Sequence, residues 1–504
     1  MSANAARERA GAAPTLAAPG WSVRQSSLRA SSERTAWAAT AGVLCFAVTA
    51  FLSRYLFWDS YLDLTGGRYV AHHGIPRHEV LTTAAHRTWI DQQWLAHWAY
   101  YEAWNVGGYP LVAALSSLFV ASGFALLCAL ISRRGVPPQR AFIWTLVAFV
   151  VCFGSTVIRA QSFAFPLFVL VLWAILADDR RPSALFLFVI PLLVLWSNLH
   201  GTILLAIMLV VGYSFARVVR AARARTPRSA ALYAAAAAAA VGTAFANPYG
   251  LSIVDYYRAL IGNPVVSRYI IEWAPPSLGF FVSYGFFALL FGVIAVTAYG
   301  LGRGWHAQPA LLGIVAFLAL LATRGVRYQV WFALAASVLA AETLAAVRPS
   351  PPKLAQRMQR VGAVVIAGFA LAAVVVLART GDAIFERLVP RGAMSAAATF
   401  AGEHPRAKIL ADAQTSSALL WLHPETVGRV GFDARLEQYP PERLRRWFTY
   451  LGAAAPGYPA LVRRYDVIVV ARKGHSSLVA GLERLRGWRT IFADDDGLAL
   501  ARSS

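Results

Sequence analysis

The sequence has few cysteines and few charged residues for its length. Only three cysteines occur among 504 residues, and Cys45, Cys128 and Cys152 all lie in apolar segments with no second cysteine nearby. Neither a disulfide framework nor a metal–thiolate site is therefore indicated. Charged residues make up 14% of the chain and apolar residues 58%. This balance excludes an ordinary soluble globular protein of this size.

The chain is also poor in acidic residues. It has 25 Asp and Glu against 47 Lys and Arg, an excess that can indicate nucleic-acid binding. Here the arginines occur in short clusters between apolar runs, which is typical of the cytoplasmic loops of membrane proteins. The sequence has no glycine-rich phosphate-binding loop, no solenoid repeat and neither an HxxxH nor an HExxH motif. Nucleic acid, ATP and a histidine-bound zinc are therefore not predicted as partners.

Eleven apolar runs are long enough to cross a bilayer, or nearly so. They begin near Trp37, Pro110, Ala141, Phe163, Ala184, Thr202, Ala230, Leu278, Pro309, Gln329 and Val361. The count depends on a tight hairpin at residues 178–182. One alternate set of connections, together with the N-terminal tail, carries twenty Lys and Arg residues, and the other set carries nine. The positive-inside rule therefore predicts a cytoplasmic N-terminus and an extracytoplasmic C-terminus.

Two less apolar regions flank the predicted membrane domain, residues 36–378. Residues 1–35 mix Ala, Ser, Gly and Pro with five arginines, and we expect a disordered cytoplasmic tail. Residues 379–504 are predicted to form an extracytoplasmic α/β domain. Its expected strands are 408–410, 428–432, 466–471, 488–492 and 497–502, and its expected helices are 416–422, 441–452 and 476–486.

The first extracytoplasmic segment, residues 58–109, contains the least ordinary residues. Asp59 and Asp63 follow the first apolar run and project from one face if this stretch is helical. Carboxylates at a membrane edge either line a substrate path or mark a helix end that meets water. Four tryptophans, among them Trp89 and Trp94, are spaced as on an amphipathic interface helix. We expect this loop to contribute to acceptor binding.

Basic side chains lie at other predicted outer helix ends. Arg159, Arg324 and Arg327 can bind a phosphate through bidentate hydrogen bonds, and His200 can donate a further one. The competing interpretation of each arginine is an ordinary loop charge or a snorkelling side chain. A lipid-linked phosphosugar would supply the driving force that ATP does not, and Asp59 is the candidate base for the acceptor hydroxyl.

A divalent cation is an alternative for the carboxylates of the first loop. Asp59, Asp63 and Asp91 offer the oxygen ligands that Mg²⁺ and Mn²⁺ prefer. The histidines of the same loop lack the spacing of a zinc site. The aspartates at 494–496 are expected in a solvated turn, because no EF-hand pattern surrounds them.

The order of these motifs matches a known pattern from the first loop to the C-terminus. The matching residues are Asp59, Tyr61, Leu64, Gly67 and Trp89, with segments 75–76, 94–95, 159–161, 196–201, 247–250, 272–273, 324–327, 431–435 and 488–495. In this order they resemble a bacterial branch of the GT-C class of membrane glycosyltransferases, relatives of polyprenyl-phosphate-sugar and protein mannosyltransferases. The chain departs from that branch at Asp63, where the branch has His.

The resemblance implies a GT-C-like fold, a first-loop aspartate as catalytic base, which falls on Asp59, and inverting transfer from a polyprenyl phosphate donor. The predicted protein is a multi-pass glycosyltransferase of the bacterial cell membrane that acts at the outer face on a glycan, lipid or protein acceptor. A transporter would favour charges near the membrane midplane and two similar halves, which the sequence lacks. A non-catalytic scaffold that binds proteins through the C-terminal domain would leave Asp59 replaceable.

Overall fold

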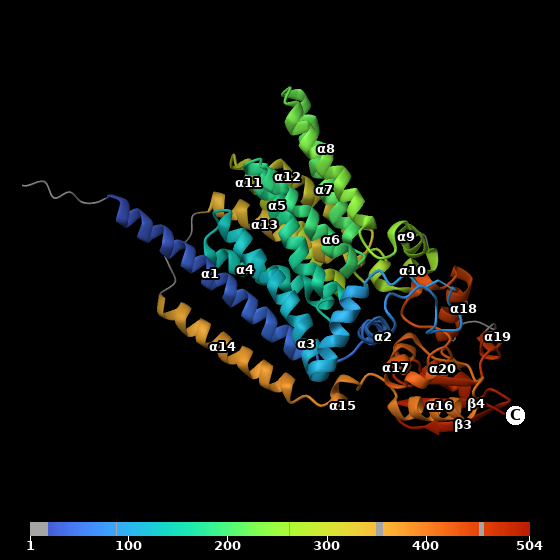
Figure 1. Cartoon of the computed structure of the whole chain (residues 1–504). Coiled ribbons are helices and arrows are strands. Elements are labelled where there is room, and N and C mark those ends of the chain that lie inside the picture. Colours follow the sequence, from blue (N-terminus) through green and yellow to red (C-terminus); the bar gives the residue numbers. More distant parts are fainter. Residues whose placement is uncertain (1–18, 87, 262, 349–355, 453–457, 504) are drawn as a thin grey trace, which may run out of the picture.

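Each of the eleven predicted apolar runs forms a helix in the computed structural model, which describes residues 19–86, 88–261, 263–348, 356–452 and 458–503 (Figure 1). These helices are α1 (Pro19–Leu52), α3 (Trp94–Arg133), α4 (Pro138–Cys152), α5 (Ala164–Arg180), α6 (Val189–Leu199), α7 (Ile203–Arg223), α8 (Pro227–Gly242), α11 (Tyr284–Gly302), α12 (Pro309–Ala322), α13 (Gln329–Val347) and α14 (Gln356–Ala378). The predicted polytopic helical fold is confirmed.

Seven of the described helices are long and apolar enough to cross a membrane on their own. A bent pair, 227–245 with 250–266, turns by 85° and adds an eighth candidate span. The helical segments Ala184–Leu199, Pro309–Ala322 and Gly362–Ala378 are apolar but shorter. Together these account for the eleven apolar runs, including both sides of the hairpin at 178–182.

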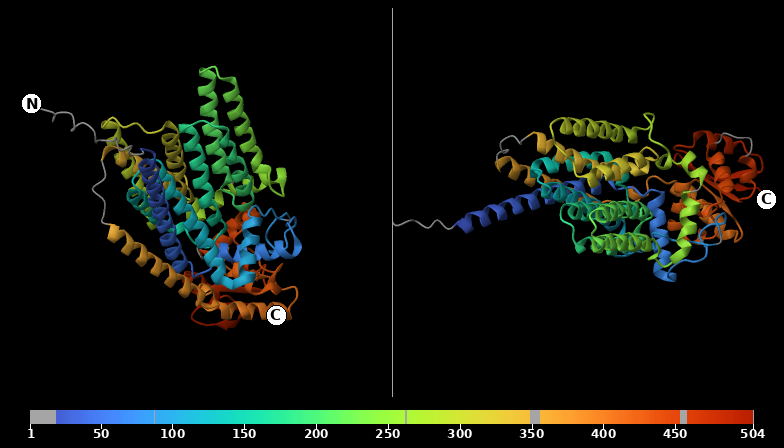
Figure 2. Two further views of the ribbon diagram at one scale, coloured as in Figure 1. Left: turned by 60° about the vertical axis from the view of Figure 1, so that its left-hand side comes forward. Right: turned by 90° about the horizontal axis from the view of Figure 1, so that it is seen from above.

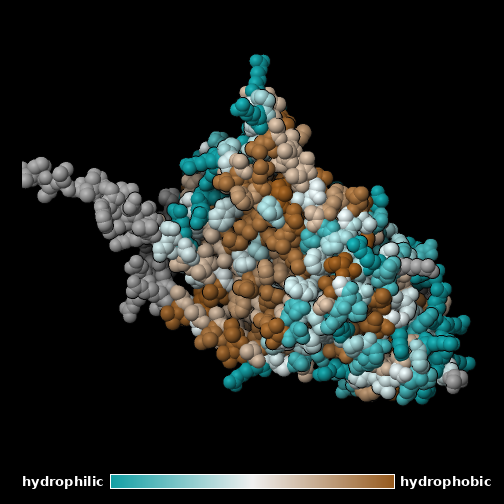
Figure 3. All heavy atoms as spheres, in the orientation of Figure 1, coloured by the Kyte–Doolittle hydropathy of each residue, from teal (hydrophilic) through white to brown (hydrophobic). Residues whose placement is uncertain are grey.

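The helices differ in how much of their surface the bundle covers. Helix α13 is buried at nearly every position from Gln329 to Ala341, as expected for a helix that is apolar all round. Helices α1 and α14 run side by side along one flank (Figure 2). On α14, Val364, Val365 and Leu371 are exposed. Apolar side chains cover the visible face of the bundle, whereas polar ones cover the C-terminal domain (Figure 3).

Helix α2 (Trp58–His73) packs closely against α3 because two glycines face it. A Cβ atom on Gly66 would lie 2.6 Å from His97 Nδ1, and one on Gly67 would overlap the His97 carbonyl. Helix α3 bends at Gly107 and Gly108, whose φ of 62° suits glycine. The bend separates an N-terminal part of α3, which carries His97, from the longer part that is apolar enough to span a membrane.

The C-terminal domain is built on a four-stranded sheet of order β1-β2-β4-β3. Strand β1 (Ile409–Leu410) is parallel to β2 (Val467–Ala471), whereas β4 (Gly497–Arg502) is antiparallel to both β2 and β3 (Trp488–Ala493). Its helices include α15 (Asp382–Phe385), α16 (Arg391–Glu403), α17 (Ala413–Leu422), α18 (Pro441–Leu451), α19 (Tyr458–Val462) and α20 (Ser476–Glu483). The expected strand at 428–432 is reduced to single bridges of Val430 with Ile409 and Thr82.

The segment between α2 and α3 extends this sheet. Thr83 N donates to Val430 O at 2.9 Å, and Gly428 N donates to Leu81 O at 2.9 Å. Helix α17 also lies on α2, where Arg68 Nη1 donates to the Trp421 carbonyl at 3.0 Å. Backbone pairing therefore joins the loop that follows α2 to the C-terminal domain, more than 300 residues later in the chain.

Two expectations differ from the structure. The tail expected to be disordered is helical from Pro19, because α1 continues outward beyond the apolar run, and residues 1–18 lie outside the described part. Trp89 is not on an amphipathic helix but in the irregular segment before α3, where the residue is 1% exposed. The helix that carries the later tryptophans begins only at Trp94.

Candidate active site

A cavity of about 440 Å³ lies where α2, α7, α9 (Ile253–Ile261) and the C-terminal domain meet. One wall is charged and polar, and is formed by Asp59, Asp63, Asp91, His97, Arg159, His200, Glu272, Arg327 and Glu437. The other wall is apolar, and is formed by Leu204, Leu205, Ile207 and Met208 of α7 with Leu260 and Ile261 of α9. The cavity therefore suits a ligand with a polar head and an apolar tail.

Local structure at the start of α2 places Asp59. Phe57 is extended, and its N–H donates to Ser60 Oγ at 3.2 Å, which caps the helix. Ser60 Oγ in turn donates to the Ile158 carbonyl at 2.6 Å. Because Ser60 follows Asp59 and Ile158 precedes Arg159, this hydrogen bond holds Asp59 and Arg159 near each other. The Asp59 side chain, 36% exposed, lines the cavity.

Arg159 lies between two carboxylates. Its Nη1 is 2.7 Å from Glu272 Oε1 and 3.9 Å from Asp59 Oδ2. The Arg159 side chain is buried, and its carbonyl accepts a hydrogen bond from Tyr100 at 3.0 Å. Nearby, the Arg327 guanidinium lies 3.9 Å from the centre of the Trp273 ring. Two guanidinium groups thus line the cavity on the side of Asp59.

These neighbours set the protonation of the polar wall. Desolvation inside the cavity raises the pKa of Asp59 to about 7, although the Arg159 charge opposes the rise. Arg159 lowers the pKa of Glu272, which therefore stays ionised. Asp59 is consequently a carboxylate whose proton affinity matches that of a general base working near neutral pH.

His200 is neutral and presents a donor to the cavity. Burial, with the charges of Arg327 and Arg159, lowers the pKa of His200 far below its usual value. Thr202 N donates to His200 Nδ1 at 3.2 Å, so Nδ1 is the acceptor and the ring proton is on Nε2. Thr202 Oγ1, 2.8 Å from Nδ1, accepts a hydrogen bond from Trp196 Nε1 at 3.2 Å. This chain of contacts orients the ring.

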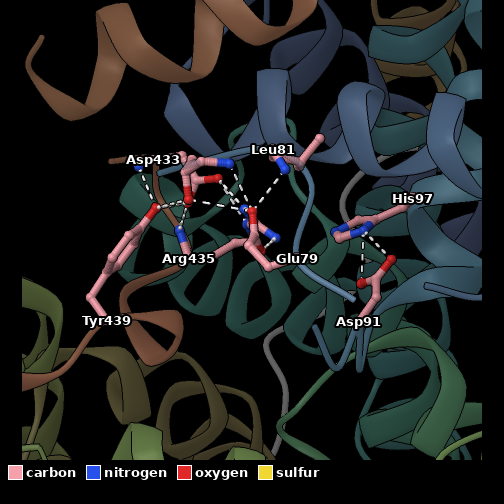
Figure 4. A network of polar contacts seen from close by, with 8 residues as sticks. Glu79, Leu81, Asp91, His97, Asp433, Arg435 and Tyr439 are labelled. Atoms are coloured by element: carbon pink, nitrogen blue, oxygen red, sulfur yellow. Dashed lines mark hydrogen bonds and ion pairs between the residues drawn. The ribbon is translucent and has the colours of Figure 1, made fainter. Parts of the chain in front are cut away.

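His97 joins two buried carboxylates of residues 58–109. Its Nε2 lies 3.1 Å from Asp63 Oδ1, and its Nδ1 lies 3.0 Å from Asp91 Oδ2 (Figure 4 shows the Asp91 contact). Because each ring nitrogen faces a carboxylate, the geometry favours a doubly protonated imidazolium. His97 therefore fixes α2 to the loop that carries Asp91, immediately beside the cavity.

A second buried network fixes the same loop from the C-terminal domain (Figure 4). Arg435 Nη1 lies 2.8 Å from Glu79 Oε2, and Arg435 Nε donates to Asp433 Oδ2 at 2.8 Å. The guanidinium also lies 4.6 Å from the centre of the Trp89 ring. Arg435 and both carboxylates are almost fully buried. Arg435 therefore positions the loop bearing Trp89 and Asp91.

Most of the residues singled out from the sequence meet in this cavity. They are Asp59, Asp63, Trp89, Asp91, Arg159, His200 and Arg327. Two others do not line it: Arg324 is exposed, and Trp94 Nε1 donates to Asn198 Oδ1 at 2.9 Å. Sequence reasoning assigned no role to His97, Glu272, Arg435 or Glu437. Only Glu272, in segment 272–273, and Arg435, in segment 431–435, had a local signal, because both segments belong to the motif pattern described above.

The carboxylates do not fit a divalent cation as they stand. Asp63 and Asp91 both face His97, and Asp59 and Glu272 both face Arg159. Among the described residues, no group of three or more His, Cys, Asp or Glu is arranged to hold a metal ion. A cation at these carboxylates would have to displace existing ion pairs, so no step below is assigned to one.

No protein-family model and no curated protein sequence matches the chain. Among solved structures, it is similar to the oligosaccharyltransferase of Archaeoglobus fulgidus in complex with Zn and sulfate, at 12% identity and a TM-score of 0.51 over 92% of this chain and 73% of that one. The apo form of that enzyme gives 11% identity and a TM-score of 0.50 over 92% and 74%.

ArnT from Cupriavidus metallidurans bound to undecaprenyl phosphate is a further match, at 13% identity and a TM-score of 0.46 over 96% of this chain and 98% of that one. Both matched proteins are GT-C glycosyltransferases. The similarity to the oligosaccharyltransferase extends over 92% of this chain, and at this identity it shows the fold alone. The chain therefore shares its overall fold with the matched membrane enzyme of Archaeoglobus fulgidus.

Proposed function

We propose that this protein is an integral membrane glycosyltransferase that moves a sugar from a polyprenyl phosphate donor to an acceptor hydroxyl. The observation that carries the proposal is the lining of the cavity, which combines Asp59 and Arg159 with the apolar side chains of α7 and α9. Oligosaccharyltransferase activity is named for solved proteins that share this fold, which supports the reaction class. A glycan, a lipid or a protein can supply the hydroxyl.

In this mechanism Asp59 acts as the base. Its carboxylate takes the proton of the acceptor hydroxyl while the acceptor oxygen bonds to the anomeric carbon, and the bond from that carbon to the phosphate oxygen breaks. Attack from the face opposite the phosphate inverts the anomeric carbon. The leaving phosphate is stabilised by the Arg159 and Arg327 guanidinium groups and by the Nε2–H of His200.

The apolar wall can contact the lipid tail of the donor. Met208 is 45% exposed and Ile261 is 62% exposed, although both line the cavity. The side between α7 and α9 is therefore open to the surroundings through apolar side chains. A polyprenyl chain leaving the cavity by this side would stay in contact with apolar surface along its path.

We assign the cavity to the extracytoplasmic side of the bacterial cell membrane. The arginine clusters at 133–134, 180–181 and 220–228 all lie at the far ends of helices whose other ends approach the cavity. The positive-inside rule makes that far face cytoplasmic. The C-terminal domain is then extracytoplasmic, which agrees with the topology expected from the loop charges.

The rate of transfer should rise with pH and level off above about pH 7. Asp59 works as a base only when ionised, and its pKa is raised to about 7. The negative charge of Glu272 contributes to the raised pKa of Asp59. Glu272→Gln should therefore lower that pKa and move the midpoint of the pH–rate profile to lower pH. Asp255→Asn, on an exposed carboxylate of α9, is the matched control. A midpoint that stays in place or moves to higher pH in Glu272→Gln would argue against Asp59 as the base.

Binding of the lipid phosphate tests the proposal before the sugar is known. Arg327 lines the cavity and Arg324, three residues earlier, does not. In native mass spectrometry with undecaprenyl phosphate, we expect Arg327→Gln to weaken binding roughly tenfold, since a charge-assisted hydrogen bond contributes about 1.5–3 kcal/mol. Arg324→Gln should bind like the wild type. Equal loss in both variants, or no binding by the wild type, would contradict the proposal.

A further inference from the structure

A second hollow, of about 650 Å³, lies at the opposite end of the helical bundle. It is bounded by the last turns of α3 and α5 and by the short helix η3 (Ala184–Phe188). After its bend, α3 continues from 109 to 133, or roughly 37 Å at 1.5 Å per residue. The hollow is therefore about one bilayer thickness from the candidate active site.

Four arginines line this hollow, and two of them have a carboxylate partner. Arg134 and Arg180 share Glu342, which lies 3.6 Å from Arg180 Nη2. Arg133 instead lies over the Trp173 ring at 5.5 Å, and Arg181 is exposed. Within the part of the chain that the structure describes, neither Arg133 nor Arg181 forms an ion pair.

Asp178, the carboxylate that lines the hollow, already contacts other side chains. Asp178 Oδ2 accepts hydrogen bonds from Tyr213 at 2.7 Å and Tyr233 at 2.6 Å, and Arg217 Nε lies 3.9 Å from it. Arg217 thus offsets Asp178, and of the four arginines that line the hollow only Arg134 and Arg180 have a carboxylate partner, the shared Glu342. The lining therefore carries an excess of positive charge. Such a site favours an anion.

The apolar surface beside the arginines indicates what carries the anion. The hollow is lined by Trp173 and Phe186 as well as by the arginines. Leu185, which also lines it, is 69% exposed, and Phe188 of the same short helix is 67% exposed. A free phosphate would use the charges alone, whereas a phospholipid would use the charges and the neighbouring apolar surface.

We infer that this hollow binds the headgroup of an anionic phospholipid from the membrane leaflet opposite the candidate active site. The phosphodiester contacts Arg133 and Arg181, and the acyl chains lie over Leu185 and Phe188. The ligand class follows from the excess positive charge at a membrane edge together with the adjoining apolar surface. This inference does not depend on the proposed transferase activity.

Native mass spectrometry of the full chain released from detergent tests the inference. The probes are cardiolipin, phosphatidylglycerol and, with the same acyl chains, phosphatidylcholine. We expect the two anionic lipids to remain bound at a charge state where phosphatidylcholine is lost. Arg133→Gln with Arg181→Gln should weaken anionic lipid binding roughly tenfold or more. Arg223→Gln with Arg228→Gln removes two exposed arginines of the same membrane face outside the hollow, and should leave binding unchanged.

Three results would overturn the inference. If phosphatidylcholine were retained as well as the two anionic lipids, the arginines would not select for an anionic headgroup. Equal losses in the two double variants would show a diffuse surface charge instead of a site. Displacement of the lipid by millimolar inorganic phosphate would identify the ligand as a free anion. Circular dichroism of both double variants checks that each retains the helical fold, and undecaprenyl phosphate binding in the active-site cavity should be the same in both.

Discussion

Replacement of Asp59 by Asn is expected to lower the transfer rate about 1,000-fold while the protein stays folded. Loss of a general base costs about 100- to 10,000-fold in rate. Asn keeps the shape of the side chain, and Arg159 keeps Glu272 as a partner at 2.7 Å, so no buried cation is left unpaired. Sugar transfer in membranes carrying equal amounts of each variant measures the effect.

The same substitution should leave lipid phosphate binding intact or make it slightly tighter. Removing a negative charge 3.9 Å from Arg159 reduces repulsion of the donor phosphate. Asp382→Asn, on an exposed carboxylate at the start of α15, is the control and should transfer sugar at the wild-type rate. A rate within threefold of wild type for Asp59→Asn would remove Asp59 from the mechanism.

The second large effect is expected at Arg435, on stability and activity together. Arg435→Gln would leave Glu79 and Asp433 buried without their cation, and breaking a buried ion pair typically costs about 3–5 kcal/mol. The loop with Trp89 and Asp91 would lose its support from the C-terminal domain. We expect faster hydrogen exchange at residues 81–84, where the loop pairs with Val430, and loss of transfer.

The comparison variant for Arg435 is Arg472→Gln. Arg472 pairs with Glu483 at 3.1 Å on the surface of the same domain, where a pair contributes at most about 1 kcal/mol. Exchange at residues 81–84 should therefore not change in this variant. If Arg435→Gln also exchanged at the wild-type rate, the buried network would not be what fixes the loop.

The membrane part of the fold was predictable because length and hydropathy are local properties of the sequence. Each apolar run forms a helix, and even the hairpin at 178–182 holds the predicted position. The strand expected at 428–432 was less predictable. Its pairing depends on Ile409 on one side and on Thr82, more than 300 residues earlier in the chain, on the other. Trp89 followed the spacing of the later tryptophans, yet packing against Arg435 holds it in an irregular segment.

The candidate site was predictable only where chemistry and chain position coincide. Asp59 and Arg159 stand out as charges at helix ends next to apolar runs. The partners that give them their properties do not, because Arg159 and Glu272 are 113 residues apart and Glu79 and Arg435 are 356 apart. Gly66 and Gly67 were visible as a pair, but their close contact with His97 requires the packed helices.

The most direct test of the central claim is mass spectrometry of lipid-linked sugars and envelope glycans from cells that lack this protein. The account predicts that one polyprenyl phosphate sugar accumulates and that one glycan, glycolipid or glycoprotein loses a sugar residue. Wild-type protein should restore both, and Asp59→Asn, present at the same level, should restore neither. Full restoration by Asp59→Asn, or no change in any lipid-linked sugar on loss of the protein, would contradict the account.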